Sequence, residues 1–83
     1  MKIHVRYFAA LREAIGLGNE TLETSCTDVA GLRAQLMARG GAHAECLSTH
    51  RPVRVAVNQV MATEATPLVE GCEVAFFPPV TGG

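Results

Sequence analysis

The residues with the clearest chemical meaning in this 83-residue sequence are its last two, Gly82 and Gly83. Glycine has no side chain, so a carboxylate carried on two glycines can enter a channel too narrow for other residues. The segment Pro78-Pro79-Val80-Thr81 precedes them, and its prolines fix φ at about −65° and lack a backbone donor. At about 3.1–3.3 Å per residue, residues 78–83 reach roughly 20 Å. The sequence therefore predicts an extended tail, stiff at its base, that can enter the active site of another protein.

Other arrangements that perform catalysis are not evident in the sequence. It offers neither paired carboxylates beside a predicted pocket nor a Ser/His/Asp arrangement, and residues 16–18 (Gly-Leu-Gly) are interpreted as a turn rather than a phosphate-binding loop. Cys26, Cys46 and Cys72 are odd in number and widely spaced, which is typical of reduced thiols in a cytosolic protein. No cysteine adjoins a convincing base, so the sequence does not favour a catalytic thiol.

One group of possible metal ligands needs weighing. His43, Cys46 and His50 stand at i, i+3 and i+7, so on a helix they would share one face, with Glu45 nearby. The helicity of this segment is uncertain from the sequence, and no fourth ligand is evident. We therefore expect a solvated or partly buried face and no metal.

Composition limits the function classes. A chain of this length forms one domain with a modest core and no room for a deep cleft. Apolar residues make up 48%, which is typical of a folded globule, whereas only 18% are charged, which suggests apolar surface for a partner. The net charge of −1 argues against nucleic acid and anionic membranes as partners. No apolar run is long enough to span a bilayer and no signal-peptide pattern is present, so we expect a cytoplasmic protein.

The secondary-structure elements that position the tail begin with two predicted strands, which form a two-stranded ribbon. Residues 2–8 alternate between polar and apolar side chains, which predicts a half-buried strand. Residues 9–15 are helix-prone and end at glycines, and residues 19–24 favour a second strand. The short spacing predicts two neighbouring strands with a helical turn between them.

The main helix follows this ribbon. Thr27 is the predicted N-cap, with Asp28 in the first turn, and residues 39–41 (Arg-Gly-Gly) supply a C-terminal stop. The spacing of the apolar residues predicts one buried helix face, made by Val29, Leu32, Leu36 and Met37. Gly31 lies inside this helix at a cost of up to about 1 kcal/mol, and it could allow close packing on the sheet.

The C-terminal half favours strands. Residues 42–50 are interpreted as a short helix or an ordered loop, residues 53–58 as a third strand and residues 60–63 as a short fourth strand. Residues 73–77 form the last strand, which places Phe76 and Phe77 on opposite faces, one in the core and one at the surface. We expect Met61 to join Phe77, Pro78 and Pro79 in an apolar patch. The whole pattern predicts an α+β domain with one mixed sheet packed on a helix.

The C-terminal half also carries a resemblance to a known family. The runs Ala-Val-Asn-Gln at 56–59, Pro-Leu at 67–68, Glu-Gly at 70–71 and Glu-Val-Ala-Phe-Phe-Pro-Pro-Val-Thr-Gly-Gly at 73–83 resemble the small subunit of molybdopterin synthase. The N-terminal Val-Arg-Tyr-Phe-Ala at 5–9 and Leu-Arg-Glu at 11–13 are similar to it too. The resemblance implies a ubiquitin-like β-grasp fold, with a domain over residues 1–77 and a tail over residues 78–83.

The resemblance also implies a chemistry. In this family a separate activating enzyme uses ATP and Mg²⁺ to adenylate the terminal glycine, and sulfur then replaces AMP to give a thiocarboxylate. In complex with the large subunit, this sulfur is donated to cyclic pyranopterin monophosphate. Carried onto this chain, the reacting group is the carboxylate of Gly83, and Gly82 supplies steric clearance. The chain would bind no cofactor itself and would be a co-substrate, with little activity alone.

The implied partners are the large subunit and the activating enzyme, which both dock on an apolar patch. On this chain the candidate partner-binding residues are Met61, Phe77, Pro78, Pro79, Val80 and Thr81, and the implied assembly is a heterotetramer. Two alternatives share the fold and the Gly-Gly ending: a sulfur carrier for thiazole or cysteine synthesis, and a ubiquitin-like protein modifier. Cys72 stands where the family commonly has an acidic residue, and we interpret it as a tolerated turn substitution rather than a reactive surface thiol near the tail.

Overall fold

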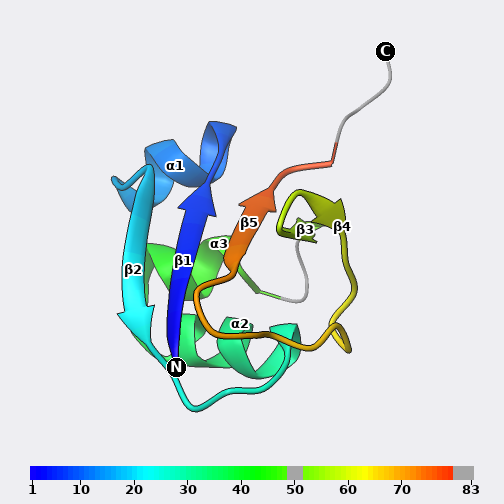
Figure 1. Cartoon of the computed structure of the whole chain (residues 1–83). Helices are drawn as coiled ribbons and strands as arrows, with labels where there is room; N and C mark the ends of the chain where they lie inside the picture. The colour runs from blue at the N-terminus through cyan, green and yellow to red at the C-terminus, as the bar shows by residue number, and fades with distance from the viewer. Residues whose placement is uncertain (49–51, 80–83) are drawn as a thin grey trace.

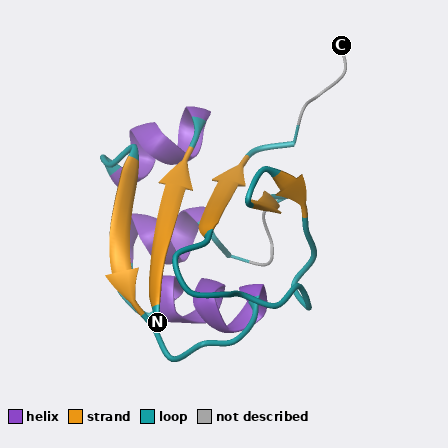
Figure 2. Cartoon of the chain, in the orientation of Figure 1, coloured by secondary structure: helices purple, strands orange, loops and turns teal. Residues whose placement is uncertain are grey.

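The computed structural model describes residues 1–48 and 52–79, which form one mixed sheet with helices on one of its faces (Figures 1 and 2). Five strands make up the sheet in the order β2-β1-β5-β3-β4: β1 (Lys2–Tyr7), β2 (Asn19–Glu23), β3 (Arg54–Val57), β4 (Val60–Met61) and β5 (Glu73–Phe77). Strand β5 lies in the middle, parallel to β1 and antiparallel to β3. This is the β-grasp arrangement of an α+β domain, as expected.

The first strand follows the predicted alternation. Ile3, Val5 and Tyr7 are buried against the helices, whereas the polar residues between them face solvent. Because side chains alternate across a strand, this pattern fixes which face of the sheet receives the helices. Helix α1 (Ala9–Ile15) then connects β1 to β2 and ends at Gly16, whose φ of +85° suits glycine. The predicted ribbon with a helical connection is confirmed.

The main helix, α2 (Val29–Met37), begins one residue later than predicted. Its N-cap is Asp28, not Thr27: the Asp28 carboxylate accepts a hydrogen bond of 2.8 Å from the Gly31 N–H. Thr27 is held outside the helix, because its carbonyl accepts from the Leu68 N–H at 2.9 Å. Tertiary pairing with the segment before β5 therefore decides which residue caps the helix.

Gly31 allows a close approach as expected, but the segment that approaches it is not the sheet. A Cβ atom at this position would meet Cys26 Cβ at 3.1 Å and Asp28 Oδ1 at 3.2 Å. The close approach is therefore between the helix and the connection that precedes it, not between the helix and the sheet.

The uncertain segment after the main helix contains helix α3 (Gly41–Cys46), and residues 49–51 lie outside the described part. Its Gly40 N-cap has a φ of +73°, so Gly40 and Gly41 turn the chain between the two helices. One continuous core lies between the helices and the sheet. Its largest fully buried side chains are those of Tyr7, Phe76, Ile3, Leu32, Leu36 and Leu47.

Candidate functional site

The base of the tail is anchored in the centre of the molecule. Phe76, near the end of β5, has no exposed surface, and its ring stacks on Tyr7 with centroids 6.4 Å apart. Its carbonyl accepts a hydrogen bond of 3.1 Å from the Phe8 N–H, and Val55 lies opposite it on β3. A strand paired on both sides is held in position along its length. The chain therefore leaves the sheet from a fixed point.

Pro78 and Pro79 follow Phe77, the last residue of β5, and both are half-buried. Neither can donate to a ladder, so pairing ends at Phe77 and the chain departs from the sheet (Figure 1). The remaining candidates in the tail, Val80, Thr81, Gly82 and Gly83, lie outside the described residues.

Phe77 faces the opposite side of the sheet from Phe76, as predicted, and is half-buried. On the outer face of the sheet, which the helices do not cover, Phe77 lines a hollow of ≈ 410 Å³ together with Arg6, Phe8, Gln59, Glu73 and Ala75. Arg6 lies over the Phe8 ring at 5.1 Å and 3.7 Å from the Glu73 carboxylate. Ala75, the smallest of the lining residues, lies opposite Ala56 in the β3–β5 ladder. The hollow combines apolar contact area with a few polar groups.

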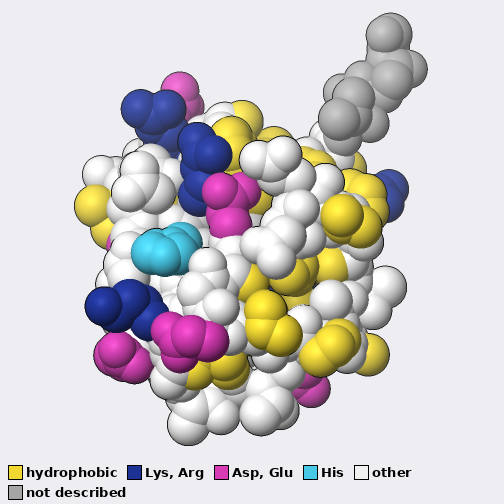
Figure 3. All heavy atoms as spheres, viewed as in Figure 1, with side chains coloured by type: hydrophobic (Ala, Val, Ile, Leu, Met, Phe, Trp, Pro, Cys, Tyr) yellow, Lys and Arg dark blue, Asp and Glu magenta, His cyan; other side chains and the backbone are white. Residues whose placement is uncertain are grey.

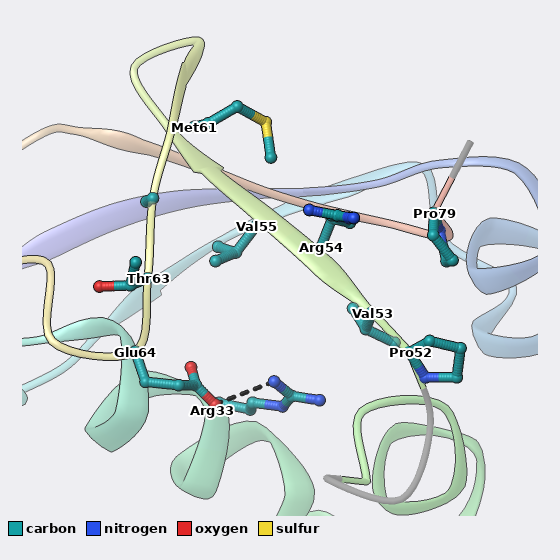
Figure 4. A pocket seen from close by; sticks show the side chains of 10 residues that line it. Arg33, Pro52, Val53, Arg54, Val55, Met61, Thr63, Glu64 and Pro79 are labelled. Atoms are coloured by element: carbon teal, nitrogen blue, oxygen red, sulfur yellow. Dashed lines mark hydrogen bonds and ion pairs between the residues drawn. The ribbon is translucent and has the colours of Figure 1, made fainter. Parts of the chain in front are cut away.

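A second hollow flanks the other side of the tail base. This groove of ≈ 440 Å³ lies between residues 52–55, at the start of β3, and residues 61–64, where the chain leaves β4 (Figure 4). Pro79 and Pro52 line one end of it and Met61 and Thr63 the other, with Arg54 between them (Figure 4).

The floor of this groove contains an arginine that the sequence did not single out. Arg33 on α2 is buried; its Nε donates to the Leu47 carbonyl at 2.6 Å and its Nη1 to the Glu64 carboxylate at 2.9 Å. A further bond joins its Nη2 to the Ser48 carbonyl at 3.1 Å. Arg33 therefore ties the helix layer to the segments around the groove and fixes the floor of the groove in place.

The apolar patch predicted from Met61, Phe77, Pro78 and Pro79 is not continuous, because its residues line two separate hollows. Met61 is 58% exposed and lines the groove with Pro79, whereas Phe77 lines the outer hollow. The β3 residues Arg54 and Ala56 lie between them, because Arg54 pairs with Phe77 and Ala56 with Met61. In Figure 3, hydrophobic side chains gather over β5, β3 and β4, and charged ones over β1 and β2. The end of β5, from which the tail starts, thus lies on the apolar half of this face.

The best-connected ionisable cluster lies elsewhere, on the helix side of the sheet. Glu20 on β2 accepts hydrogen bonds from the Tyr7 hydroxyl at 2.8 Å, Arg39 Nη1 at 2.5 Å and His43 Nε2 at 3.3 Å. Burial alone would raise the pKa of the Glu20 carboxyl, but these three hydrogen bonds outweigh it and hold that pKa below its usual value. Burial and then the Glu20 carboxylate raise the pKa of Tyr7.

This cluster joins the helices to the sheet. Arg39 follows α2 and His43 lies on α3, so one carboxylate fastens two helices to β2. Tyr7 in turn packs against Phe76, on the strand that carries the tail. No spacing in the sequence indicated this cluster, because its members come from four separate segments.

Among the described residues, the other candidates from the sequence are not gathered into one site. Helix α3 ends at Cys46, so the single helix face needed to join His43, Cys46 and His50 does not extend to residue 50, which lies outside the described residues. Cys46 is in the core and His43 is bonded to Glu20. Cys72 is only 3% exposed and lies before β5, at the opposite end from the tail, so it is no surface thiol.

Within the described segments, no helix is long and apolar enough to cross a membrane.

The sequence itself matches a family model over residues 5–83, that of the ThiS family. Two curated relatives are named "Molybdopterin synthase sulfur carrier subunit". The relative from Escherichia coli K12 is 38% identical over 98% of this chain and 99% of its own length. The relative from Mycobacterium tuberculosis is 39% identical over 100% of this chain and 99% of its own length.

Two solved structures are similar to this chain over nearly all of their length. One, from Helicobacter pylori, is described as a protein–protein complex of subunits 1 and 2 of molybdopterin-converting factor; its matching chain has a TM-score of 0.70 and 27% identity, with 100% of both chains covered. The other, from Pyrococcus furiosus, is described as a putative molybdopterin converting factor, subunit 1. It has a TM-score of 0.79 and 27% identity, over 96% of this chain and 99% of its own.

Proposed function

Because this chain belongs to the ThiS family and to the family of its molybdopterin synthase sulfur carrier relatives, we propose that it carries sulfur on Gly83 for molybdenum cofactor synthesis. The single observation that carries this proposal is the anchored tail base. Strand β5, paired on both sides, ends at Phe77, and Pro78 and Pro79 follow it without a backbone donor that could extend the pairing. A carrier needs its reacting end to project from a rigid body into a partner's active site.

The chemistry begins with activation, since a carboxylate is a poor electrophile. A separate enzyme with ATP and Mg²⁺ converts the Gly83 carboxylate into an acyl adenylate. Attack by a sulfur nucleophile on the acyl carbon then forms a C–S bond and releases AMP. The resulting thiocarboxylate is anionic at neutral pH, so it needs no base on this small domain. Gly82 provides the steric clearance that a narrow channel requires.

The sulfur is then donated to cyclic pyranopterin monophosphate within a complex with the large subunit. We place the groups that bind this substrate on the large subunit, so the chain is a co-substrate with little activity alone. Docking uses both hollows beside the tail base, through Phe77 on one side and Met61 and Pro79 on the other. Apolar contacts at the centre of an interface with charges at its rim are typical of such docking. The cytoplasm supplies ATP and the partners.

The intact mass of the protein tests this function. After incubation with the activating enzyme, ATP and a sulfur source, we expect a gain equal to the exchange of one oxygen for sulfur. Deleting Gly83 should abolish the gain without changing the circular dichroism spectrum. If no sulfur source produces the gain, the carrier function is wrong.

Two alternative functions of the same tail, sulfur transfer in another pathway and protein modification, are distinguished from the proposed one by further measurements. A carrier for thiazole or cysteine synthesis would gain sulfur but would not support molybdopterin formation with the large subunit. A protein modifier would instead give isopeptide-linked conjugates in cell extracts. Molybdopterin formation from the thiocarboxylated chain and the large subunit favours the proposed pathway over both.

A further inference from the structure

The amine nucleophiles of this chain are unusually few. Lys2 is the only lysine in the sequence, and the other basic residues of the Lys and Arg total of 7 are arginines. The arginine guanidinium stays protonated in proteins and does not act as a nucleophile at neutral pH. Only the Lys2 side chain and the amino group of Met1 could therefore capture an activated carboxyl group as an amide.

Both amines lie at the end of the sheet opposite the tail base. Lys2 begins β1, and the Met1 ammonium is bound by the Thr24 carbonyl at 3.1 Å and the Glu23 carboxylate at 3.4 Å. Strand β5 runs parallel to β1, with Phe76 opposite Tyr7, so it carries the chain away from Lys2 (Figure 1).

The distance between these amines and the tail base exceeds the reach of the tail. Lys2 precedes Tyr7 by five residues, and Pro79 follows Phe76 by three, so at about 3.3 Å per residue the separation is roughly 25 Å. The four residues beyond Pro79 span at most about 13 Å when fully extended. Even with the length of a lysine side chain added, the Gly83 carboxyl does not meet Lys2 of the same molecule.

The cysteine thiols are also inaccessible to the tail, two of them because they are buried. Cys72 and Cys46 are 3% and 6% exposed, respectively. Cys26 is half-buried, with its Sγ 3.5 Å from the Gln35 side-chain oxygen, and it lies in the connection that starts next to Met1, where the Thr24 N–H donates to the Met1 carbonyl. Neither hollow beside the tail base is lined by lysine or cysteine.

We propose that the surface around the tail base is a zone free of amines and thiols, which prevents the activated Gly83 carboxyl from acylating an amine or thiol of its own domain and leaves it to an external sulfur donor. The inference rests on the function proposed above. An acyl adenylate reacts with an amine by forming a C–N bond, breaking the acyl–phosphate C–O bond and releasing AMP and a proton. With hydrosulfide, the same C–O bond breaks and a thiocarboxylate forms. Which product forms depends on which nucleophile the tail can meet.

The test places an amine inside this zone. Arg54→Lys keeps the positive charge and sets a primary amine opposite Phe77, in the groove that Pro79 also lines. The variant and the wild-type chain are incubated with the activating enzyme and ATP, without a sulfur source, and intact masses are measured. For Arg54→Lys we expect a product lighter by one water, with a bond from Gly83 to position 54 in tandem mass spectra. The wild-type chain should form no such product.

Val69→Lys is the matched control, because Val69 is 58% exposed and lies near Lys2, outside both hollows. This variant should behave as the wild-type chain does. The inference is overturned if the wild-type chain cyclises as readily as Arg54→Lys. It is also overturned if Arg54→Lys releases pyrophosphate but forms no internal amide, since the activating enzyme would then protect the tail by itself.

A parallel reaction with hydrosulfide separates this inference from the proposed function. If the wild-type chain releases pyrophosphate but gains no sulfur, the carrier function fails, while the cyclisation of Arg54→Lys still decides the inference. With hydrosulfide present, Arg54→Lys should divide between thiocarboxylate and internal amide, and a rising hydrosulfide concentration should shift it toward the thiocarboxylate. A product ratio that does not respond to hydrosulfide would contradict competition for one activated carboxyl.

Discussion

Phe76 and Phe77 are consecutive residues with opposite environments: the Phe76 ring has no exposed surface and stacks on Tyr7, whereas Phe77 lines a hollow on the outer face of the sheet. Because side chains alternate along a strand, one residue holds the tail base in the core while the next leaves an aromatic ring on the outer face, where we propose that it contacts a partner. The anchoring by Phe76 and the proposed docking by Phe77 can therefore be tested separately.

Phe77→Asp should weaken docking while the domain stays folded. A carboxylate in the outer hollow must be desolvated on binding, and aromatic anchors contribute strongly to interfaces, so we expect affinity for the large subunit to fall about tenfold or more. Isothermal titration calorimetry measures the affinity, and circular dichroism checks the fold. Val69→Asp, at an exposed apolar residue outside both hollows, is the control and should bind normally. Unchanged affinity of Phe77→Asp would remove Phe77 from the interface.

Phe76→Ala should act on stability instead. Truncating a fully buried phenylalanine costs about 3–5 kcal/mol, a large part of the roughly 5–15 kcal/mol that stabilises a typical domain. Urea unfolding followed by circular dichroism should show a much lower midpoint for Phe76→Ala than for Phe77→Ala. Similar midpoints for the two variants would contradict the assignment of Phe76 as the anchor.

Gly82→Val should block the chemistry of the tail without changing the domain. A branched side chain next to the reacting carboxyl obstructs a narrow channel and displaces the reacting atoms, so thiocarboxylate formation should slow by on the order of tenfold or more. The rate of mass gain with the activating enzyme, ATP and hydrosulfide measures this. Ala65→Val makes a branched substitution at an exposed loop position and should leave the rate unchanged. An unaffected Gly82→Val would show that the channel does not require glycine.

Glu20 should make stability depend on pH on the acid side. Its pKa is lower in the folded state than the ordinary value of 4.5, so protons bind more readily to the unfolded chain. The stabilisation from Glu20 is therefore fully present above about pH 4.5 and is lost as the pH falls through the folded pKa. Glu20→Gln should reduce the free energy of unfolding by about 1–3 kcal/mol at pH 7.

This difference between Glu20→Gln and the wild-type chain should narrow as the pH falls below 4.5 and through the lowered folded-state pKa of Glu20. Urea unfolding at several pH values measures it. A difference that stays constant with pH would show that the Glu20 charge does not contribute. His43→Ala serves as a comparison that removes one hydrogen bond to Glu20 but keeps those from Tyr7 and Arg39.

Much of the fold was predictable from the sequence because it depends on local periodicity. Alternation along residues 2–8 and 73–77 identified β1 and β5 and separated Phe76 from Phe77. The apolar spacing of Val29, Leu32 and Leu36 identified the buried face of α2, and all three have no exposed surface. Chain reach and the two prolines predicted an extended tail after Phe77, whereas the sulfur chemistry came from the resemblance of residues 73–83 to a known family.

Tertiary pairing decided the features that depend on contacts between distant segments. The bond from the Leu68 N–H to the Thr27 carbonyl keeps Thr27 outside the helix and leaves Asp28 as the cap. The β3–β4 register sets Met61 apart from Phe77, and burial closes off the Cys72 thiol.

By itself, the sequence determined the order of the elements, the single lysine and the tail, since each can be read from one stretch of chain or a count. Only the tertiary structure decided where these features lie relative to one another. The parallel pairing of β1 with β5 places Lys2 and the tail base at opposite ends of the sheet. The Glu20 cluster depends on four segments that meet only after folding. Distances between residues far apart in sequence follow from packing, which no local pattern specifies.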